Sequence, residues 1–172
     1  MLLNLPSLPT ILLDIAVWLI IHVGVSFAVT HIPLGSFNNE FWLYEQKKWE
    51  KGGKIYVKIF GLKKWKRRLP DGAALFKKGF RKKHLTGRDY VYLDSFIRET
   101  CRAELAHWIM LLLSPVFFIW NIWWVGIVMV IYAVLANLPC IIIQRYNRIR
   151  LIRVYARIAT LPVRSAASGS DS

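Results

Sequence analysis

The sequence contains an uncharged stretch of forty residues, Leu105 to Gln144, in which no Asp, Glu, Lys or Arg occurs. A single helix of this length would be about 60 Å long, whereas the hydrocarbon core of a bilayer is about 30 Å thick. The stretch therefore predicts two membrane spans joined by a turn. We expect the turn at Trp120–Trp124, because this segment contains three tryptophans and one amide, and tryptophan favours the water–lipid boundary.

A second apolar block, Ile11 to Thr30, is interrupted only by Asp14 and His22. The two blocks predict an all-α integral membrane protein with about three transmembrane helices. One span lies near 11–30, and a C-terminal helical hairpin has spans near 107–120 and 124–143. Because ionisable groups inside a span are costly, Asp14 and His22 form either a structural hydrogen bond or part of a functional site.

The basic residues predict the orientation of these spans. The net charge is +14, with 18 of the 24 Lys and Arg residues between Lys47 and Arg102 and 6 after Gln144. Three spans place the basic segments 36–106 and 144–164 on the same side of the membrane, and the positive-inside rule makes that side cytoplasmic. We therefore expect a multi-pass membrane protein with an external N-terminus.

The spans and basic segments are expected to form a single membrane domain over 1–164, followed by a small, polar and disordered tail at 165–172. Ser26-Phe27-Ala28 resembles a signal-peptide cleavage site, which leaves open whether the first span is removed. We favour an uncleaved span, because no Lys or Arg precedes the apolar block.

The basic segments have the pattern of amphipathic helices that lie in the membrane interface. We expect a helix over 37–51 capped by Ser36, a second over 54–69 ending in a Leu69–Gly72 turn, and a third beginning at Gln144. Basic and aromatic residues also occur together in nucleic-acid-binding proteins. Here they border membrane spans, so the predicted partners are anionic membrane lipids and not nucleic acid.

Polar residues at the mouth of the hairpin form the first candidate site. Glu104 and His107 are three positions apart, so the carboxylate could orient the imidazole as a base that removes a proton from a hydroxyl. The hairpin brings this pair to the exit of the third span, where an anion or an oxyanion could be bound. The expected substrate-binding residues are Arg102, Gln144, Arg145, Asn147 and Arg148.

Two other interpretations of these polar residues stay open. The same side chains could simply anchor the ends of the spans, with His107 among lipid headgroups and Glu104 paired with Arg102 or an arginine of the tail. His84 and Asp89 match the His-x-x-x-x-Asp pattern of glycerolipid acyltransferases, which makes His84 an alternative base, although the glycine-rich block of those enzymes is missing. A metal site is not expected, because a lone Glu-x-x-His provides too few ligands.

Four stretches, in this order and spacing, resemble the bacterial glycosyl-4,4'-diaponeurosporenoate acyltransferases. The likeness extends from the first span to about Arg157, and RAEL-x-HW and QRYNR are its most specific parts. The stretches are KKWKRRLPDG (Lys63–Gly72), His84-Leu85, ETCRAELAHW (Glu99–Trp108) and YAVLANLPCIIIQRYNRIRL (Tyr132–Leu151).

The resemblance implies a membrane O-acyltransferase at the last step of staphyloxanthin-type carotenoid synthesis. Such an enzyme esterifies the glucose C6 hydroxyl of a glycosylated C30 carotenoid acid with a fatty acyl chain. No bound cofactor is implied, and an acyl-CoA or acyl carrier is the expected co-substrate. The alternatives are a non-catalytic membrane partner of other carotenoid-pathway or glycolipid enzymes, and a transferase that acts on another glycolipid.

Overall fold

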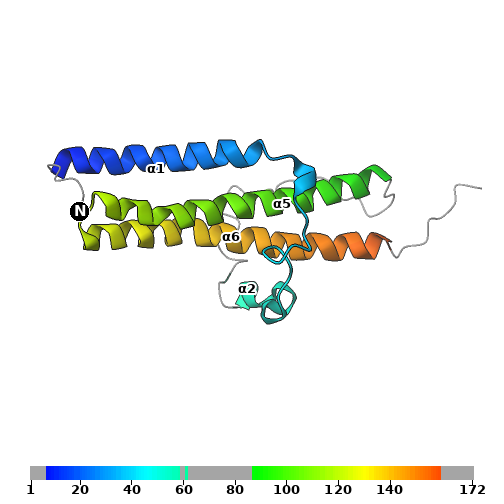
Figure 1. Ribbon diagram of the computed structural model, residues 1–172. Coiled ribbons are helices and arrows are strands. Elements are labelled where there is room, and N and C mark those ends of the chain that lie inside the picture. The colour runs from blue at the N-terminus through cyan, green and yellow to red at the C-terminus, as the bar shows by residue number, and fades with distance from the viewer. Residues whose placement is uncertain (1–6, 59–60, 62–86, 160–172) are drawn as a thin grey trace, which may run out of the picture.

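The protein is built from three long helices that lie side by side (Figure 1). The computed structural model describes residues 7–58, 61 and 87–159, and within these ranges every regular element is helical. This confirms the predicted all-α class. Helix α5 runs antiparallel to its two neighbours (Figure 1). The long helices are α1 (Ser7–Thr30), α5 (Gly87–Leu113) and α6 (Trp123–Ala159).

The structure confirms three helices that are long and apolar enough to cross a membrane. Their apolar segments are Leu8–Thr30, Tyr90–Ile119 and Trp123–Arg157. Much of the apolar surface of α1 faces outward, where a soluble protein would lose stability but a membrane protein contacts lipid. The most exposed apolar side chains of α1 include Leu8, Ile15, Leu19, Ile20 and Phe27.

The predicted turn between the second and third spans is also confirmed. Helix α5 passes into the 3₁₀ helix η4 (Ser114–Ile119), and the chain reverses before α6 begins at Trp123. Pro115 is tolerated near the start of η4, where its missing N–H costs no helical hydrogen bond. The Phe118 ring packs over Gly126, where an added Cβ would lie 2.3 Å from a ring carbon. Gly126 therefore allows the close packing of η4 on α6.

The prediction of a helix over 37–51 is wrong. Residues 37–47 form turns between two 3₁₀ helices, η1 (Leu34–Ser36) and η2 (Lys48–Gly53), and 48–51 belong to η2. The physical reason is a competing set of tertiary hydrogen bonds, because arginines of α6 donate to the backbone carbonyls of three consecutive residues here. Those carbonyl oxygens belong to Leu43, Tyr44 and Glu45.

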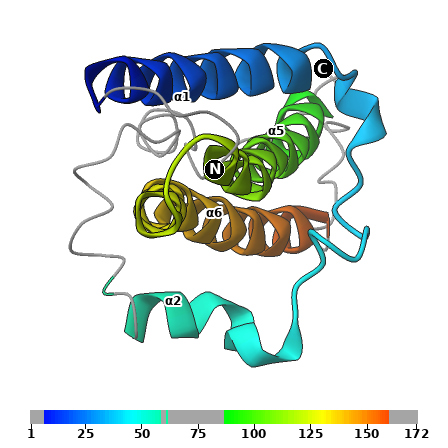
Figure 2. The same ribbon diagram turned by 60° about the vertical axis from the view of Figure 1, so that its left-hand side comes forward.

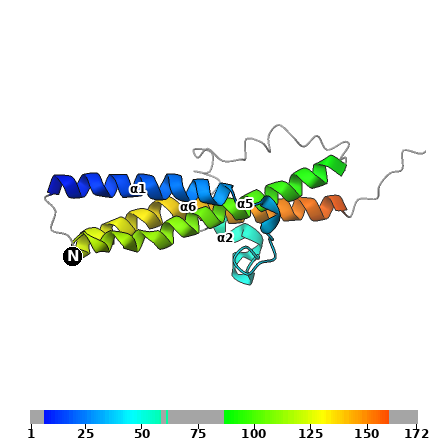
Figure 3. The same ribbon diagram turned by 45° about the horizontal axis from the view of Figure 1, so that its top comes forward.

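The structure also differs from the prediction at Gln144, where no separate interfacial helix begins. Helix α6 continues without interruption to Ala159, so the basic tail extends the third span. The early part of α5 packs beside this extension through a small apolar cluster of Leu93, Ile97 and Leu151. Figure 3 shows α5 and α6 projecting together past the C-terminal end of α1.

The segment that follows α1 crosses the hairpin to its opposite side. It ends in the short helix α2 (Lys54–Lys58), which lies against α6 on the side away from α1 (Figure 2). Tyr56 of α2 is buried in an apolar cluster with Ile142, Ile143 and Ile149 of α6. The predicted Leu69–Gly72 turn lies outside the described residues.

Asp14 joins α1 to the turn of the hairpin. Its Oδ1 atom accepts hydrogen bonds from Trp120 Nε1 and Asn121 Nδ2, both at 2.8 Å. Nearby, the rings of Trp18 and Phe117 stack with their centroids 4.7 Å apart. Asp14 is buried, so these bonds supply the partners that a carboxylate in this environment needs. This contact supports the structural interpretation of Asp14.

We predict that Asp14→Ala lowers the free energy of unfolding by about 2 kcal/mol, because two buried donors lose their acceptor. Thermal unfolding of the purified protein in a neutral detergent measures the change. Leu19→Ala is the matched control, since Leu19 lies on the outward face of the same helix and is 64% exposed. Equal stability of the Asp14→Ala variant and the parent protein would contradict a structural role.

Candidate active site

Glu104 is the centre of a buried ion-pair network between α5 and α6. Its Oε1 atom accepts a hydrogen bond from Arg145 Nη1 at 2.9 Å, and its Oε2 atom accepts one from Arg148 Nη2. Trp108 Nε1 donates a third bond to Oε1 at 3.2 Å. The antiparallel hairpin places these residues together although 41 positions separate Glu104 from Arg145.

The segment before α2 adds a second carboxylate to this network. Arg145 Nε donates to Glu50 Oε1 at 2.8 Å, and the Tyr56 hydroxyl donates to the same oxygen. The backbone N–H of Lys47 donates to Glu50 Oε2. Glu50 and Glu104 are both fully buried, and they balance the charges of Arg145 and Arg148. The network, which we call the arginine clamp, therefore consists of Glu50, Glu104, Arg145 and Arg148.

The environment of the clamp shifts several pKa values, including those of Glu50 and Tyr44. Burial by itself raises the pKa of Glu50, but hydrogen bonds from Arg145, Tyr56 and the Lys47 N–H outweigh burial, and the net pKa is lowered. Burial is also the largest cause that raises the pKa of Tyr44 to about 12. Glu50 is therefore ionised at neutral pH and Tyr44 is neutral.

The clamp agrees with the alternative in which Glu104 pairs with an arginine of the tail, and it differs from the expected pair of Glu104 and His107. Glu104 bonds Arg145 and Arg148 in place of His107, because the chain reversal brings the guanidinium groups to its carboxylate. The arginines in turn donate to Glu104, Glu50 and backbone carbonyls, so these bonds occupy most of the N–H groups that were expected to bind an anionic donor. Among the described residues, Arg148 Nη1 is buried without a hydrogen-bond partner.

His107 instead contacts Asn137, a residue of α6 that the sequence analysis did not single out. His107 Nδ1 lies 2.9 Å from Asn137 Oδ1, while Asn137 Nδ2 donates to the Ala133 carbonyl at 2.9 Å. Since the amide nitrogen donates to a carbonyl, its oxygen must accept from a protonated Nδ1. That assignment leaves Nε2 as the basic nitrogen of a neutral imidazole. Asn137 thus orients His107 as Glu104 was expected to do.

His107 lines a cavity of about 400 Å³ between α1 and α5. The lining combines apolar side chains with hydroxyl, carboxylate, guanidinium and imidazole groups, as binding sites for amphipathic ligands do. The lining residues are Ser26, Val29, Thr30, Glu99, Arg102, Ala103, Ala106, His107 and Met110.

Arg102 brings a positive charge to this cavity. Its Nη1 atom is 3.2 Å from Glu99 Oε1, and its Nη2 atom donates to the Ile32 carbonyl at 3.4 Å. Among the described residues, its Nε atom is buried without a hydrogen-bond partner. Buried donors are normally satisfied, so this N–H is an exception in a residue that lines the cavity.

The remaining predicted residues lie elsewhere. Gln144 and Asn147 belong to α6 but do not line the cavity, and Asn147 is buried. His84 lies outside the described residues, and only the backbone of Asp89 is described. Within the described ranges, no group of three or more His, Cys, Asp and Glu side chains is arranged to hold a metal ion.

Sequence reasoning missed Glu50 and Asn137 for different reasons. Glu50 lies in a strongly basic segment, where an acidic residue has many nearby charges and its true partner is 95 positions away. Asn137 carried a usable signal, because a primary amide in the interior of an apolar span is expected to be hydrogen-bonded or functional.

Comparison with known proteins identifies the relatives of this chain. A sequence model of the glycosyl-4,4'-diaponeurosporenoate acyltransferases matches residues 40–157. Proteins of that name from Staphylococcus aureus strains N315, USA300 and Newman are each 35% identical over 137 residues, which cover 80% of this chain and 82% of the relative. No solved structure matches the chain. The matched region includes Arg102, His107 and Asn137.

We predict that Glu104→Gln lowers the free energy of unfolding by about 3–5 kcal/mol, because it leaves Arg145 and Arg148 buried with too little negative charge. Denaturation of the purified protein in detergent measures the loss. Glu45→Gln is the control, since Glu45 forms an exposed pair with Lys47 and should contribute less than about 1 kcal/mol. Similar losses in both variants would show that the clamp is not specially stabilising.

Proposed function

Because the chain belongs to the glycosyl-4,4'-diaponeurosporenoate acyltransferase family, we propose that it esterifies the glucose C6 hydroxyl of a glycosylated C30 carotenoid acid with a fatty acyl chain. Family membership establishes an acyltransferase of a carotenoid pathway. The proposal adds that the acylated group is the glucose C6 hydroxyl and that the acyl group is a fatty acyl chain. It also adds that the reaction is the last step of staphyloxanthin-type synthesis.

The contact between His107 and Asn137 beside the α1–α5 cavity is the observation that supports the site. In the proposed reaction, His107 Nε2 accepts the proton of the sugar hydroxyl while the hydroxyl oxygen attacks the acyl carbonyl carbon. The tetrahedral intermediate then expels the donor's leaving group, which takes the proton from the imidazolium. Asn137 acts as a positioning residue that keeps the proton of the resting ring on Nδ1.

Arg102 is the proposed stabiliser of the negative charge that develops on the carbonyl oxygen. Arg102 lines the same cavity as His107 and carries a fixed positive charge, and oxyanion stabilisation requires such a group in place before the reaction. The co-substrate is an acyl-CoA or an acyl carrier. The cavity suits these ligands because Val29, Ala106 and Met110 provide apolar contacts beside the polar groups.

The proposed location is the bacterial cell membrane, with the basic segments at its cytoplasmic face. The positive-inside rule supports this orientation, because the hairpin brings the basic ends of α5 and α6 to the same side (Figure 1). A polyene could then lie within the bilayer while its sugar lies at the interface.

We predict that His107→Ala reduces acylated carotenoid formation by about 10²–10⁴-fold, because the general base is lost. Asn137→Leu should reduce the rate by about tenfold or more and change its pH profile, because the Nδ1 tautomer is no longer fixed. Chromatography and mass spectrometry of pigments from a host that makes the glycosylated substrate measure the products, and the purified protein gives the pH profile.

His31→Ala is the control for loss of a histidine, because His31 is exposed and the described contacts of its side chain are with Phe27 alone, through the Phe27 carbonyl and ring. Its product level should match that of the parent chain. Normal acylation by His107→Ala would exclude His107 as the base. A product that carries the acyl group at another position would overturn the C6 assignment and leave the base intact.

We predict opposite labelling of the two ends of the bundle by a membrane-impermeant maleimide. A cysteine in place of Trp123, which is 72% exposed at the hairpin turn, should react from outside intact cells. A cysteine in place of Trp49, which is 55% exposed at the basic end, should react only after the membrane is opened. The parent chain measures the background of Cys101 and Cys140. Reversed labelling would overturn the orientation.

A further inference from the structure

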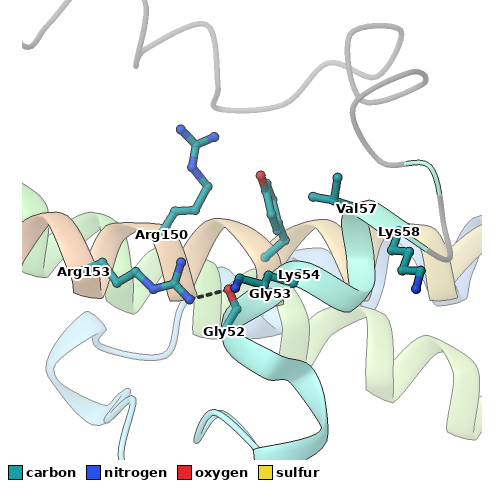
Figure 4. Close-up of a pocket in the computed structure, with 8 residues that line it drawn as sticks. Gly52, Gly53, Lys54, Val57, Lys58, Arg150 and Arg153 are labelled. Atoms are coloured by element: carbon teal, nitrogen blue, oxygen red, sulfur yellow. Dashed lines mark hydrogen bonds between the residues drawn. The ribbon is translucent and has the colours of Figure 1, made fainter.

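A second cavity, of about 340 Å³, lies between α2 and the basic extension of α6. We call it the basic groove. Figure 4 shows Lys54 and Lys58 on the α2 side and Arg150 and Arg153 on the α6 side. The other residues that line it are Gly52, Gly53, Val57 and Tyr146.

The described residues that line the basic groove carry four positive charges and include no acidic side chain. Within the described ranges, none of the four cations forms an ion pair, because the clamp carboxylates are already bound to Arg145 and Arg148. Arg150 lies over the Tyr146 ring, with 5.6 Å between its Cζ atom and the ring centroid. All four cations are exposed, so a diffusing anion can reach them.

The walls of the groove are held in place by specific local structure. Gly52 and Gly53 have φ angles of +65° and +79°, which other residues rarely adopt. Gly53 lies close to α6, because an added Cβ would lie 3.3 Å from a ring carbon of Tyr146. Arg153 donates a hydrogen bond to the Gly52 carbonyl (Figure 4). The bond from Arg145 to Glu50 fixes the same segment from the other end.

The position of the groove along α6 indicates the ligand. Tyr146 and Arg150 follow the uncharged stretch by two and six residues, or about 3 and 9 Å along the helix axis. This is the depth of phospholipid headgroups, which begin where the hydrocarbon core ends. Arginine and lysine together favour phosphate, since guanidinium groups give directed hydrogen bonds and ammonium groups a concentrated charge.

We propose that the basic groove is a binding site for a single phosphate group. Two sources carry this chemistry: the headgroup of an anionic phospholipid, and a soluble phosphate ester such as coenzyme A. The site is separate from the cavity that contains His107, because α2 and α1 lie on opposite sides of the hairpin (Figure 2). The proposal of a phosphate site therefore does not depend on which residue is the catalytic base.

The test uses the full-length protein in a neutral detergent, titrated with dioctanoyl phosphatidylglycerol or with coenzyme A. Native mass spectrometry counts the bound molecules. The variant Lys54→Gln/Lys58→Gln should weaken binding on the order of tenfold or more, because each lysine near a bound phosphate contributes to the binding free energy. Arg150→Gln should weaken it from the other wall. Lys48→Gln/Lys51→Gln is the matched control, because it removes the same charge from exposed lysines outside the groove.

Saturable binding of phosphatidylglycerol alone identifies a headgroup site, and saturable binding of coenzyme A identifies a site for a soluble phosphate ester. Competition between the two ligands identifies one site that accepts both. Each of these results supports the proposal if the groove variants bind weakly and the control binds normally. Equal weakening in the control pair would show diffuse attraction to a basic surface and overturn it. The absence of saturable binding for either ligand would also overturn it.

Discussion

The rest of the structure depends on a buried network of ion pairs at the basic end of the bundle. Glu104 of α5 and Glu50 of the preceding segment together neutralise Arg145 and Arg148 of α6. A buried charge without a partner costs several kcal/mol, so none of these residues is stable in the interior without the others. The clamp therefore does more than join two helices. Its arginines also bond three backbone carbonyls, which holds the segment between α1 and α2 across the hairpin.

This arrangement separates the residues that hold the fold from those available for chemistry. His107 lies one helical turn from Glu104 on α5, yet its partner is Asn137 and it faces the cavity beside α1. The proximity of Glu104 and His107 in sequence indicated a pair, because side chains three positions apart lie on the same side of a helix. The stronger attraction of two guanidinium groups determines the partner of Glu104. The amide of Asn137 then contacts the His107 imidazole, and Arg102 brings a positive charge to the same cavity.

The arginines of α6 also fall into two groups, one structural and one exposed to solvent. Arg145 and Arg148 are buried and paired with carboxylates of the protein, whereas Arg150 and Arg153 on the same helix are exposed at the basic groove. Their positions on the helix decide this difference, because α5 and the Glu50 segment cover the side that carries Arg145 and Arg148. A count of positive charges cannot distinguish a structural arginine from one that is available to a ligand. Both kinds occur within the QRYNR block and the two turns that follow it.

The sequence by itself determined the class of fold, the three spans and the turn at Trp120, because a bilayer limits how long an uncharged segment can be. It also brought Glu104 near Arg145 and Arg148, since a hairpin places the ends of its two helices together. Only the tertiary structure decided which neighbour each side chain bonds. Glu50 belongs to the clamp although 95 positions separate it from Arg145. Turns whose carbonyls accept hydrogen bonds from arginines take the place of the helix expected over 37–51. Local sequence patterns do not encode such long-range contacts, because they depend on how separate segments pack against one another.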